Sequence, residues 1–195
     1  SESILVMEHE LFRHIEIEMF VARSDLTEAM AFTESLLKCL DGDPSAFSQQ
    51  QQERLLAIGK WELVTEAVGS YTHAYPICIR RVLPDETLIS MAADATDSAY
   101  AISFISYVRP QDRAGFNRFA GIVCEVMGQL FDARPHWGKV CPVSASEAER
   151  LYPQLKDFRR IADNADSAAQ FRNAWIDETL FVSSGQGPQE KQPRV

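Results

Sequence analysis

Alternation of apolar and acidic residues near the start of the chain predicts a β-strand with one polar face. Residues 15–21 read Ile-Glu-Ile-Glu-Met-Phe-Val, which is the period-two pattern of a strand. A helical pattern follows, in which Ser24 and Asp25 can cap the N-terminus and the run from Asp41 to Pro44 ends the helix. Its inward positions recur at helical spacing: Leu26, Met30, Thr33, Leu36, Leu37 and Leu40. The chain therefore opens with a strand and an amphipathic helix.

The middle of the chain mixes helical and strand patterns. The polar run 48–53 fits either a flexible loop or the start of a second helix, and 61–68 is ambiguous, with helix preferred over strand. Runs rich in β-branched and aromatic residues predict three further strands: 75–83, 87–91 and 99–108. Pro110 then opens a long amphipathic helix. Its apolar side contains Phe116, Phe119, Ile122, Val123, Val126, Met127 and Leu130.

The last third of the chain contains an irregular segment, 133–143, and two helical patterns over 144–158 and 166–181. The tail 183–195, rich in Gly, Pro, Gln and Lys, is expected to be disordered. The order of elements predicts an α+β fold in which helices cover an antiparallel sheet. Strands from both halves of the chain are expected to pair in that sheet, which makes residues 1–182 one domain.

Composition and motif content restrict the function. A hydrophobic content of 46% and a charged content of 24% are typical of a globular protein, and the net charge of −9 argues against a nucleic-acid binder. We expect a cytoplasmic protein, because the sequence has neither an apolar run of membrane-spanning length nor an N-terminal signal pattern. It also has no glycine-rich phosphate loop, so a dinucleotide would need another domain to hold its pyrophosphate.

The cysteines and acidic residues do not predict a metal site. The four cysteines are widely spaced and form neither a CxxC motif nor a Cys/His cluster: Cys39, Cys78, Cys124 and Cys141. Two of them lie in strongly apolar segments and are predicted to be reduced core cysteines. Asp94 and Asp97 lack the glycine and distal glutamate of a calcium loop, so they are interpreted as a solvated loop.

A compact polar segment between two predicted helices is the first candidate for a functional site. It reads Arg134-Pro135-His136-Trp137-Gly138-Lys139. Loops that hold a cation, an imidazole and an indole on a backbone stiffened by Pro and Gly are good candidates for binding or catalysis. By residue chemistry alone, the segment also fits a structural turn, with Trp137 in the core and Lys139 in solvent.

Arg80, in the predicted strand 75–83, is the second candidate. Strand alternation gives this segment two faces, one with Cys78, Arg80 and Val82 and the other with Ile77, Ile79 and Arg81. Ile77 and Ile79 are predicted to fill the core. Arg80 is either a site residue or a charge at the sheet edge, and the presence of Arg81 leaves open which arginine points inward.

These motifs together resemble the C-terminal part of the aldonolactone oxidases. That family includes gulonolactone, arabinonolactone and alditol oxidases, within the vanillyl-alcohol-oxidase-type flavoproteins. The resemblance rests on the order of the segment 134–139 and the residues after it: Leu151-Tyr152-Pro153, Phe158, Asp166, Phe171 and Asn173-Ala174-Trp175. Residues 76–80 and 85–90 resemble the family's Pro-x-Glu-Ile/Val-Arg strand and following segment, and Glu16–Val21 resembles the strand that opens its cap domain. The resemblance covers about residues 12 to 182.

The resemblance implies the substrate-binding cap domain of an FAD-dependent oxidase of sugar lactones or polyols. FAD would be held mainly by an N-terminal domain outside this chain. The family's enzymes move a hydride from a carbinol carbon to the flavin. By resemblance, Lys139 stabilises the reduced flavin and Arg80 binds the substrate oxygen. His136 and Trp137 would line the flavin pocket, and His136 would also contact the substrate.

The chain departs from the family at two places. Cys78 stands where the family has a glutamate, and because a thiol is a weak donor without a fixed charge, substrate choice and activity depend on this position. The family's Asp-Pro-x-Gly turn reads Asp166-Ser167-Ala168-Ala169, which predicts an earlier start of the last helix. The alternative hypothesis is a non-catalytic sugar-binding or interaction module that kept the fold. Cys78 favours it and Lys139 opposes it.

Overall fold

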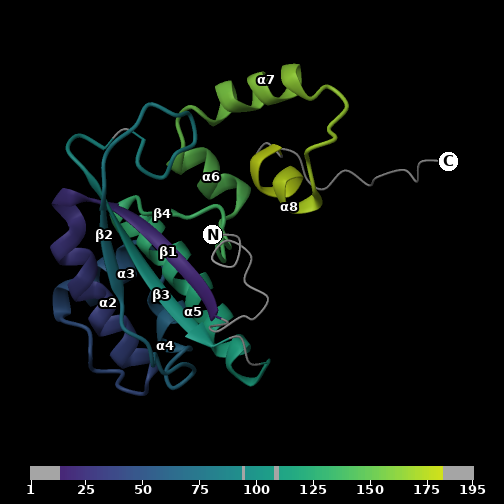
Figure 1. The fold of residues 1–195 in the computed structure, drawn as a ribbon. Coiled ribbons are helices and arrows are strands. Elements are labelled where there is room, and N and C mark those ends of the chain that lie inside the picture. Colours follow the sequence, from purple (N-terminus) through teal and green to yellow (C-terminus); the bar gives the residue numbers. More distant parts are fainter. Residues whose placement is uncertain (1–13, 94, 108–109, 182–195) are drawn as a thin grey trace, which may run out of the picture.

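Strand β1 (His14–Ala22) is the central element of the fold. The computed structural model describes residues 14–93, 95–107 and 110–181. β1 pairs along its whole length with the antiparallel strand β3 (Ala99–Tyr107). Its other edge pairs with the two-residue strand β4 (Arg134–Pro135), while β2 (Cys78–Val82) pairs with the far edge of β3. The order β2-β3-β1-β4 therefore joins strands from both halves of the chain (Figure 1).

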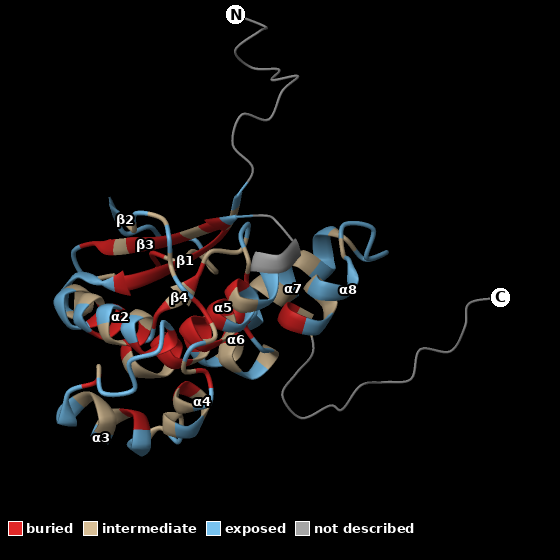
Figure 2. Cartoon of the chain, turned by 90° about the horizontal axis from the view of Figure 1, so that it is seen from below, coloured by how far each residue is buried: buried red, intermediate tan, exposed pale blue. Residues whose placement is uncertain are grey.

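Helices α2 (Leu26–Leu40) and α5 (Pro110–Phe131) cover one face of the sheet (Figure 2). The apolar positions of the β1 alternation point to this face, because every second residue of a strand shares a face. The core between the layers includes Ile17, Met19, Val21, Phe32, Leu36, Ile102, Phe104, Phe116 and Phe119. The predicted α+β class, an antiparallel sheet with helices on it, is confirmed. Among the described residues, no helix has both the length and the apolar character needed to cross a membrane.

The polar run 48–53 forms the start of a helix, α3 (Gln49–Ala57), rather than a flexible loop. Ser48 Oγ accepts a hydrogen bond from Gln51 N at 3.3 Å, and Gln51 Oε1 accepts one from Ser48 N at 2.9 Å. This reciprocal capping box satisfies two N–H groups at the helix start, which is why the polar sequence is helical. The preferred helix at 61–68 is also observed, in the shorter form α4 (Trp61–Thr65).

The helix predicted over 144–158 is two helices, α6 (Ala145–Leu151) and α7 (Leu155–Ala165). The break falls at Tyr152, whose φ of −122° and ψ of 88° lie outside the helical region. Pro153 explains the break, because a proline disfavours the helical conformation of the residue before it. The side chain of Tyr152 is buried at the break.

The prediction of a helix over 166–181 is wrong for its first half. Helix α8 (Ala174–Ile176) begins at residue 174 and continues into a π-helical turn, η2 (Asp177–Phe181). The carboxylate of Asp166 accepts hydrogen bonds from the N–H groups of Gln170 and Phe171, each at 2.8 Å, and Ala169 has a φ of 53°. The Asp166 side chain thus competes with the helix for these donors. The tail 183–195 lies outside the described residues.

The strand predicted over 87–91 is also wrong, since these residues form turns. The carboxylate of Asp85 accepts hydrogen bonds from Thr87 N at 2.8 Å, from the Thr87 hydroxyl and from the Ser90 hydroxyl. Local side-chain acceptors of this kind hold a chain in a turn and deny its N–H groups to a sheet. Residues 85–93 form a loop, called the 85–93 loop below, with a single parallel bridge between Asp85 and Ala93.

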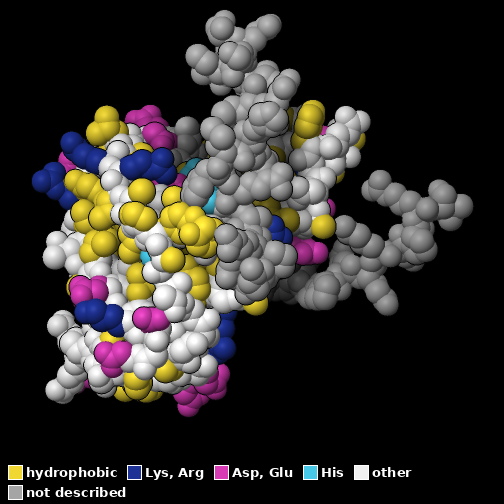
Figure 3. All heavy atoms as spheres, turned by 60° about the horizontal axis from the view of Figure 1, so that its bottom comes forward, with side chains coloured by type: hydrophobic (Ala, Val, Ile, Leu, Met, Phe, Trp, Pro, Cys, Tyr) yellow, Lys and Arg dark blue, Asp and Glu magenta, His cyan; other side chains and the backbone are white. Residues whose placement is uncertain are grey.

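Strand β2 lies at the edge of the sheet and is mostly exposed, which corrects the expected burial of Ile79. Ile79 is 44% exposed, and Leu83, just beyond the strand, is 67% exposed. The two covering helices pack against β1 and β3 and leave this edge open. Figure 3 shows one face of the molecule on which hydrophobic side chains gather, with Lys and Arg side chains beside them. Ile77, by contrast, packs against the core.

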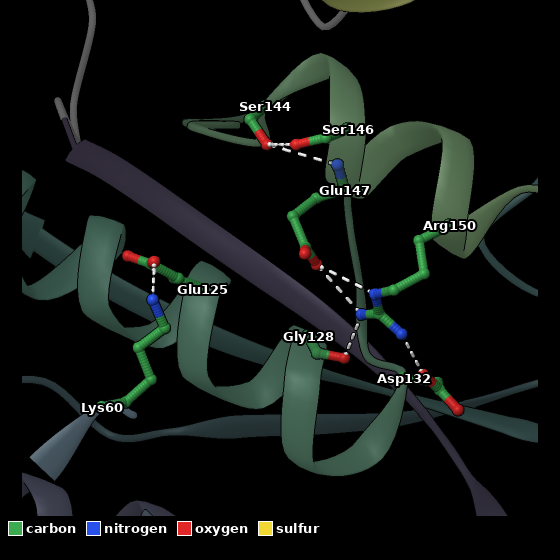
Figure 4. A network of polar contacts seen from close by, with 8 residues as sticks. All are labelled: Lys60, Glu125, Gly128, Asp132, Ser144, Ser146, Glu147 and Arg150. Atoms are coloured by element: carbon green, nitrogen blue, oxygen red, sulfur yellow. Dashed lines mark hydrogen bonds and ion pairs between the residues drawn. The ribbon is translucent and has the colours of Figure 1, made fainter. Parts of the chain in front are cut away.

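Helix α6 is tied to the end of α5 through Arg150 (Figure 4). The guanidinium donates to the carbonyl of Gly128 at 2.5 Å, to the Asp132 carboxylate and to Glu147 Oε2 at 3.0 Å. Asp132 has a φ of 48°, the left-handed conformation that often ends a helix, so the cation lies where the α5 dipole is negative. Segment 134–139 lies between these two helices, and the clamp therefore restrains both of its ends.

Replacing Arg150 with Met tests this clamp. We expect the free energy of unfolding to fall by about 1 to 2 kcal/mol, because the methionine keeps part of the packing but loses the charged hydrogen bonds. Urea unfolding measures the change. The control is Arg160→Met, which removes an exposed pair with Asp157 at i,i+3. It should lower the free energy of unfolding by only about 0.3 kcal/mol. Equal losses in the two variants would contradict the clamp.

Candidate active site on the open face of the sheet

The face of the sheet opposite α2 and α5, called the open face, carries the polar half of the β1 alternation. Glu16, Glu18 and Phe20 point to it, and the register places Ser103 of β3 directly between Glu18 and Cys78 of β2. Both carboxylates are nearly buried, Glu16 at 8% exposed and Glu18 at 2%. Buried carboxylates need charged or hydrogen-bonded partners, so the groups that cover them define the site.

Arg80 reaches across the sheet to Glu18. One nitrogen of its guanidinium, Nη2, donates to Glu18 Oε1, and the Ser103 hydroxyl donates to the same oxygen at 2.9 Å. The hydrogen bond and negative charge of Glu18 raise the pKa of Arg80, which keeps it cationic. The side chain of Arg80 is nevertheless 61% exposed. Arg80 is thus a cation held by Glu18, and the rest of its guanidinium N–H groups can face solvent. Of the two neighbouring arginines, Arg80 is the one that binds this carboxylate.

Segment 134–139 is fixed along the free edge of β1. Arg134 and Pro135 pair with Phe20 and Met19 as strand β4. Beyond the strand, His136 N donates to the carbonyl of Glu18 and Val140 N to that of Glu16, both at 2.9 Å. These bonds hold the loop to β1 beyond the strand, with residues 136–140 spanning the two-residue step from Glu18 to Glu16. His136 and Lys139 are thereby held over the open face.

Lys139 pairs with the second carboxylate. Its Nζ lies 2.6 Å from Glu16 Oε2, and the lysine side chain is 33% exposed. Burial raises the pKa of Glu16, but the hydrogen bond and charge of Lys139, helped by Ser103 and His14, outweigh it and leave that pKa below its usual value. The open face therefore carries two carboxylate–cation pairs on successive outward positions of β1.

His136 is oriented by its own loop. The N–H of Gly138 donates to His136 Nδ1 at 2.9 Å, so Nδ1 is an acceptor and the ring proton of the neutral imidazole is on Nε2. A side chain at 138 would crowd the ring, because a Cβ there would lie 3.2 Å from His136 Cε1. The imidazole is next to Phe20, with ring centroids 6.0 Å apart. His136 thus presents an N–H donor.

Arg80 and His136 line one pocket of about 420 Å³ with Glu18. Its other walls come from the end of β2 and from the 85–93 loop. The additional lining residues are Phe20, Arg81, Val82, Asp85, Ser90, Met91, Ala92 and Ala101. The pocket combines cationic and N–H donors with an adjacent carboxylate, an arrangement that suits an oxygen on which negative charge develops.

Trp137 points away from this pocket. Its indole N–H donates to the carbonyl of Ile89 at 2.8 Å, and its ring lies 4.8 Å from that of Tyr152 between centroids. It lines a second pocket of about 470 Å³ together with residues 86–91 and Phe158. The structure thus brings together Arg80, His136 and, on the next row, Lys139, and separates Trp137 from them.

The acidic loop 94–97 is an ion-paired surface loop where it is described. Asp97 pairs with Arg23 at 2.5 Å and with Arg81 at 3.4 Å, while Asp94 lies outside the described residues. Over residues 14–93, 95–107 and 110–181, no three His, Cys, Asp or Glu side chains come together in a way that could hold a metal ion.

The comparison with known families shows the family to which the chain belongs. Residues 8–179 match the family model described as D-arabinono-1,4-lactone oxidase. The chain belongs to this family. It is a family of flavoprotein oxidoreductases, and the sequence resemblance is therefore confirmed.

Named relatives of the chain are also oxidases. It is 49% identical over 186 residues to a long-chain alcohol oxidase of an uncultured marine euryarchaeote, with 95% of this chain and 39% of that protein covered. It is 44% identical over 50 residues to an alditol oxidase of Streptomyces sp., and these residues cover 26% of this chain and 12% of that protein. An L-gulonolactone oxidase of Mus musculus is 25% identical over 133 residues, which cover 68% of this chain and 29% of that protein. The chain thus spans well under half the length of each of these relatives.

Cys78 lies where the family resemblance expects a glutamate. It is exposed, whereas Cys39, Cys124 and Cys141 are buried, and none of the four forms a disulfide. Its register partner is Ser103, so it shares a row with Glu18, the carboxylate that binds Arg80. In this member of the family, the arginine takes its carboxylate partner from the central strand.

Sequence reasoning missed Glu16, Glu18 and Ser103 as site residues. It assigned the acidic positions of β1 to a wet strand face, yet both are buried. The available signal was two carboxylates at i and i+2 on a strand whose other face is apolar, together with cations at Arg80 and Lys139. Their proximity depends on the order of the strands, which residue types alone do not give.

Lowering the pH tests the Lys139–Glu16 pair. The pKa of Glu16 in the folded protein is below its ordinary value of 4.5. The ionised carboxylate therefore stabilises the fold at every pH above 4.5, and this contribution is lost as the pH falls through the lowered pKa. The stability gap between the wild type and Glu16→Gln should therefore be present at pH 7 and close toward pH 3 in urea titrations.

The matched control is Glu34→Gln, which breaks an exposed pair with Lys38 at the same separation of 2.6 Å. Its smaller effect should disappear in high salt, because exposed charges are screened, while that of Glu16→Gln persists. A Glu16→Gln gap that is independent of pH would rule out the ionised pair.

Proposed function

We propose that this domain forms the substrate side of an FAD-dependent oxidase that converts a carbinol to a carbonyl. When bound, FAD supplies the acceptor for the hydride that leaves the carbinol carbon. The carbinol is common to sugar lactones, the substrates that the sequence resemblance implies, and to the alditols and long-chain alcohols in the names of relatives. The observation that carries the proposal is the pair of cations, Arg80 and Lys139, fixed on one face beside a pocket.

The residues of the open face fit one edge of a flavin and not its pyrophosphate. Lys139 presents an ammonium that is partly exposed and held by a loop bonded to β1. A fixed point charge of this kind suits the ring edge that becomes anionic on reduction. The sequence offers no glycine-rich cradle for the pyrophosphate, so the proposal places that function in an N-terminal domain beyond this chain.

Arg80 binds the substrate oxygen in this proposal. Its contact with Glu18 occupies one nitrogen, and the exposed remainder of the guanidinium lines the pocket with the imidazole of His136. The two donors stabilise charge on the oxygen as the hydride departs. Glu18, which touches Arg80 and lines the same pocket, is positioned to accept the hydroxyl proton.

The second candidate function is a non-catalytic sugar-binding or interaction module. The observation that favours it is the compensation of Lys139 by Glu16, which leaves the pair with no net charge. The first test is direct. Purified full-length protein that carries no flavin, and shows no flavin absorbance after reconstitution with FAD, would favour the module over the enzyme.

Lys139→Met in the full-length protein tests the role of the ammonium. The rate of flavin reduction by substrate, measured by anaerobic stopped-flow absorbance, should fall by about 10²- to 10³-fold while flavin stays bound. The matched control, Lys38→Met, also removes a lysine paired with a glutamate at 2.6 Å and should leave the rate unchanged. Retention of the wild-type rate in Lys139→Met would contradict the proposal.

Arg80→Ala is compared with Arg160→Ala, which removes another arginine paired with a carboxylate, that of Asp157, outside the pocket. Loss of Arg80 should lower kcat/KM by about 10²-fold or more, because a charged donor to the reacting oxygen is removed. Loss of Arg160, whose pair with Asp157 is exposed, should leave kcat/KM within about threefold of the wild type. Steady-state kinetics with the full-length protein decides, and comparable losses would refute the specific role of Arg80.

A further inference from the structure

The open face changes from polar to apolar along the direction of its strands. Three successive rows of register partners cross β1, β3 and β2: Glu18, Ser103 and Cys78; then Phe20, Ala101 and Arg80; then Ala22, Ala99 and Val82. Rows two residues apart are separated by about 7 Å. Arg80 lies in the middle row and reaches back to Glu18. Within the sheet, Glu18 is therefore on one side of the guanidinium, and the row of Ala22, Ala99 and Val82 is on the other.

An apolar cluster continues the second and third rows under the 85–93 loop. Its buried members are Phe20, Ala92, Ala99 and Ala101, with Val82, Met91 and Ala95 packed against them. Five of these residues also border the 420 Å³ pocket: Phe20, Val82, Met91, Ala92 and Ala101. A substrate whose oxygen is held by Arg80 and His136 thus meets hydrocarbon beyond its carbinol carbon.

The two polar side chains that the 85–93 loop contributes to the pocket, Asp85 and Ser90, already bind groups of the loop itself. The Asp85 carboxylate accepts from Thr87 and Ser90. Arg134 donates to the carbonyls of Ser90 and Ala93, at 3.2 and 2.7 Å, and Trp137 donates to that of Ile89. A second substrate hydroxyl placed against this loop would lose water and gain little in return, whereas a methylene group would gain from burial.

From this distribution we infer that the alcohol oxidised at this site is aliphatic. Its one hydroxyl lies at Arg80 and its hydrocarbon chain lies against the apolar cluster, in contrast to a polyol or a sugar lactone. The inference rests on the proposed function. The reaction converts R–CH₂OH to R–CHO, with the hydride passing to the flavin and the hydroxyl proton to Glu18.

Cys78 is the specificity-determining residue in this inference. It is exposed in the same row as Glu18, one row away from Arg80, and lies where the family resemblance expects a glutamate. A carboxylate there would accept hydrogen bonds from a second substrate hydroxyl. A thiol is a weak donor and a weak acceptor, so it offers such a hydroxyl little.

A substrate series on the full-length flavoprotein tests the inference. Anaerobic flavin reduction is measured with n-butanol, n-hexanol, n-octanol and n-decanol, and with xylitol and gulonolactone. We expect kcat/KM to rise roughly fourfold per added methylene until the pocket is filled. The best aliphatic alcohol should exceed xylitol and gulonolactone by about 10²-fold or more.

The possible outcomes separate the inference from the function on which it rests. If xylitol or gulonolactone reduces the flavin as fast as the best aliphatic alcohol, the inference is overturned and the oxidase function stands. If no compound of any class reduces the flavin, the proposed function fails, and the inference falls with it.

Cys78→Glu and Cys78→Ser test the determinant itself at an exposed position, where folding tolerates substitution. The preference is the ratio of kcat/KM for n-octanol to kcat/KM for xylitol. Cys78→Glu should lower this ratio by about tenfold or more, which is the effect of one well-placed hydrogen bond to a charged group. Cys78→Ser, which keeps the size of the side chain without a charge, should leave the preference within about threefold of the wild type. An unchanged preference in Cys78→Glu would exclude Cys78 as the determinant.

Discussion

The need to pair two carboxylates on the central strand organises the open face of this protein. Glu16 and Glu18 occupy successive outward positions of β1 and are almost completely buried. An unpaired charge in such a position costs several kcal/mol, on the order of 3 to 5. Each element that covers this face therefore brings a cation or a donor to them. The edge strand β2 brings Arg80, β3 brings Ser103, and the loop after β4 brings Lys139.

The segment 134–139, which contributes Lys139, also holds the 85–93 loop that forms the opposite wall of the pocket. Arg134 and Trp137 donate to backbone carbonyls of the 85–93 loop, whereas His136 and Lys139 face the open side of β1. One short segment thus borders two pockets, with His136 in one and Trp137 in the other. Trp137 therefore contacts the 85–93 loop and not the open face.

The sequence predicted the fold class and the strands β1, β2 and β3, because period-two and helical patterns are long and regular there. It failed at 87–91 and 166–173, where Asp85 and Asp166 bind nearby N–H groups and their side chains decide the conformation. Arg80, His136 and Lys139 were found from motifs. Glu18 and Ser103 were not, because their importance comes from the strand order β2-β3-β1, a tertiary property that local patterns do not encode.

The thiol at position 78 leaves the polar contacts of the open face intact. If Arg80 depended on a carboxylate within its own strand, a thiol at position 78 would leave the guanidinium without its partner. Glu18 removes that dependence, because it is buried on the central strand and binds Arg80 together with Ser103. The cation therefore stays fixed whatever stands at position 78. An exposed residue beside a cation that is anchored elsewhere can vary without a cost in stability, and substrate choice can change at such a position while the reacting groups are kept.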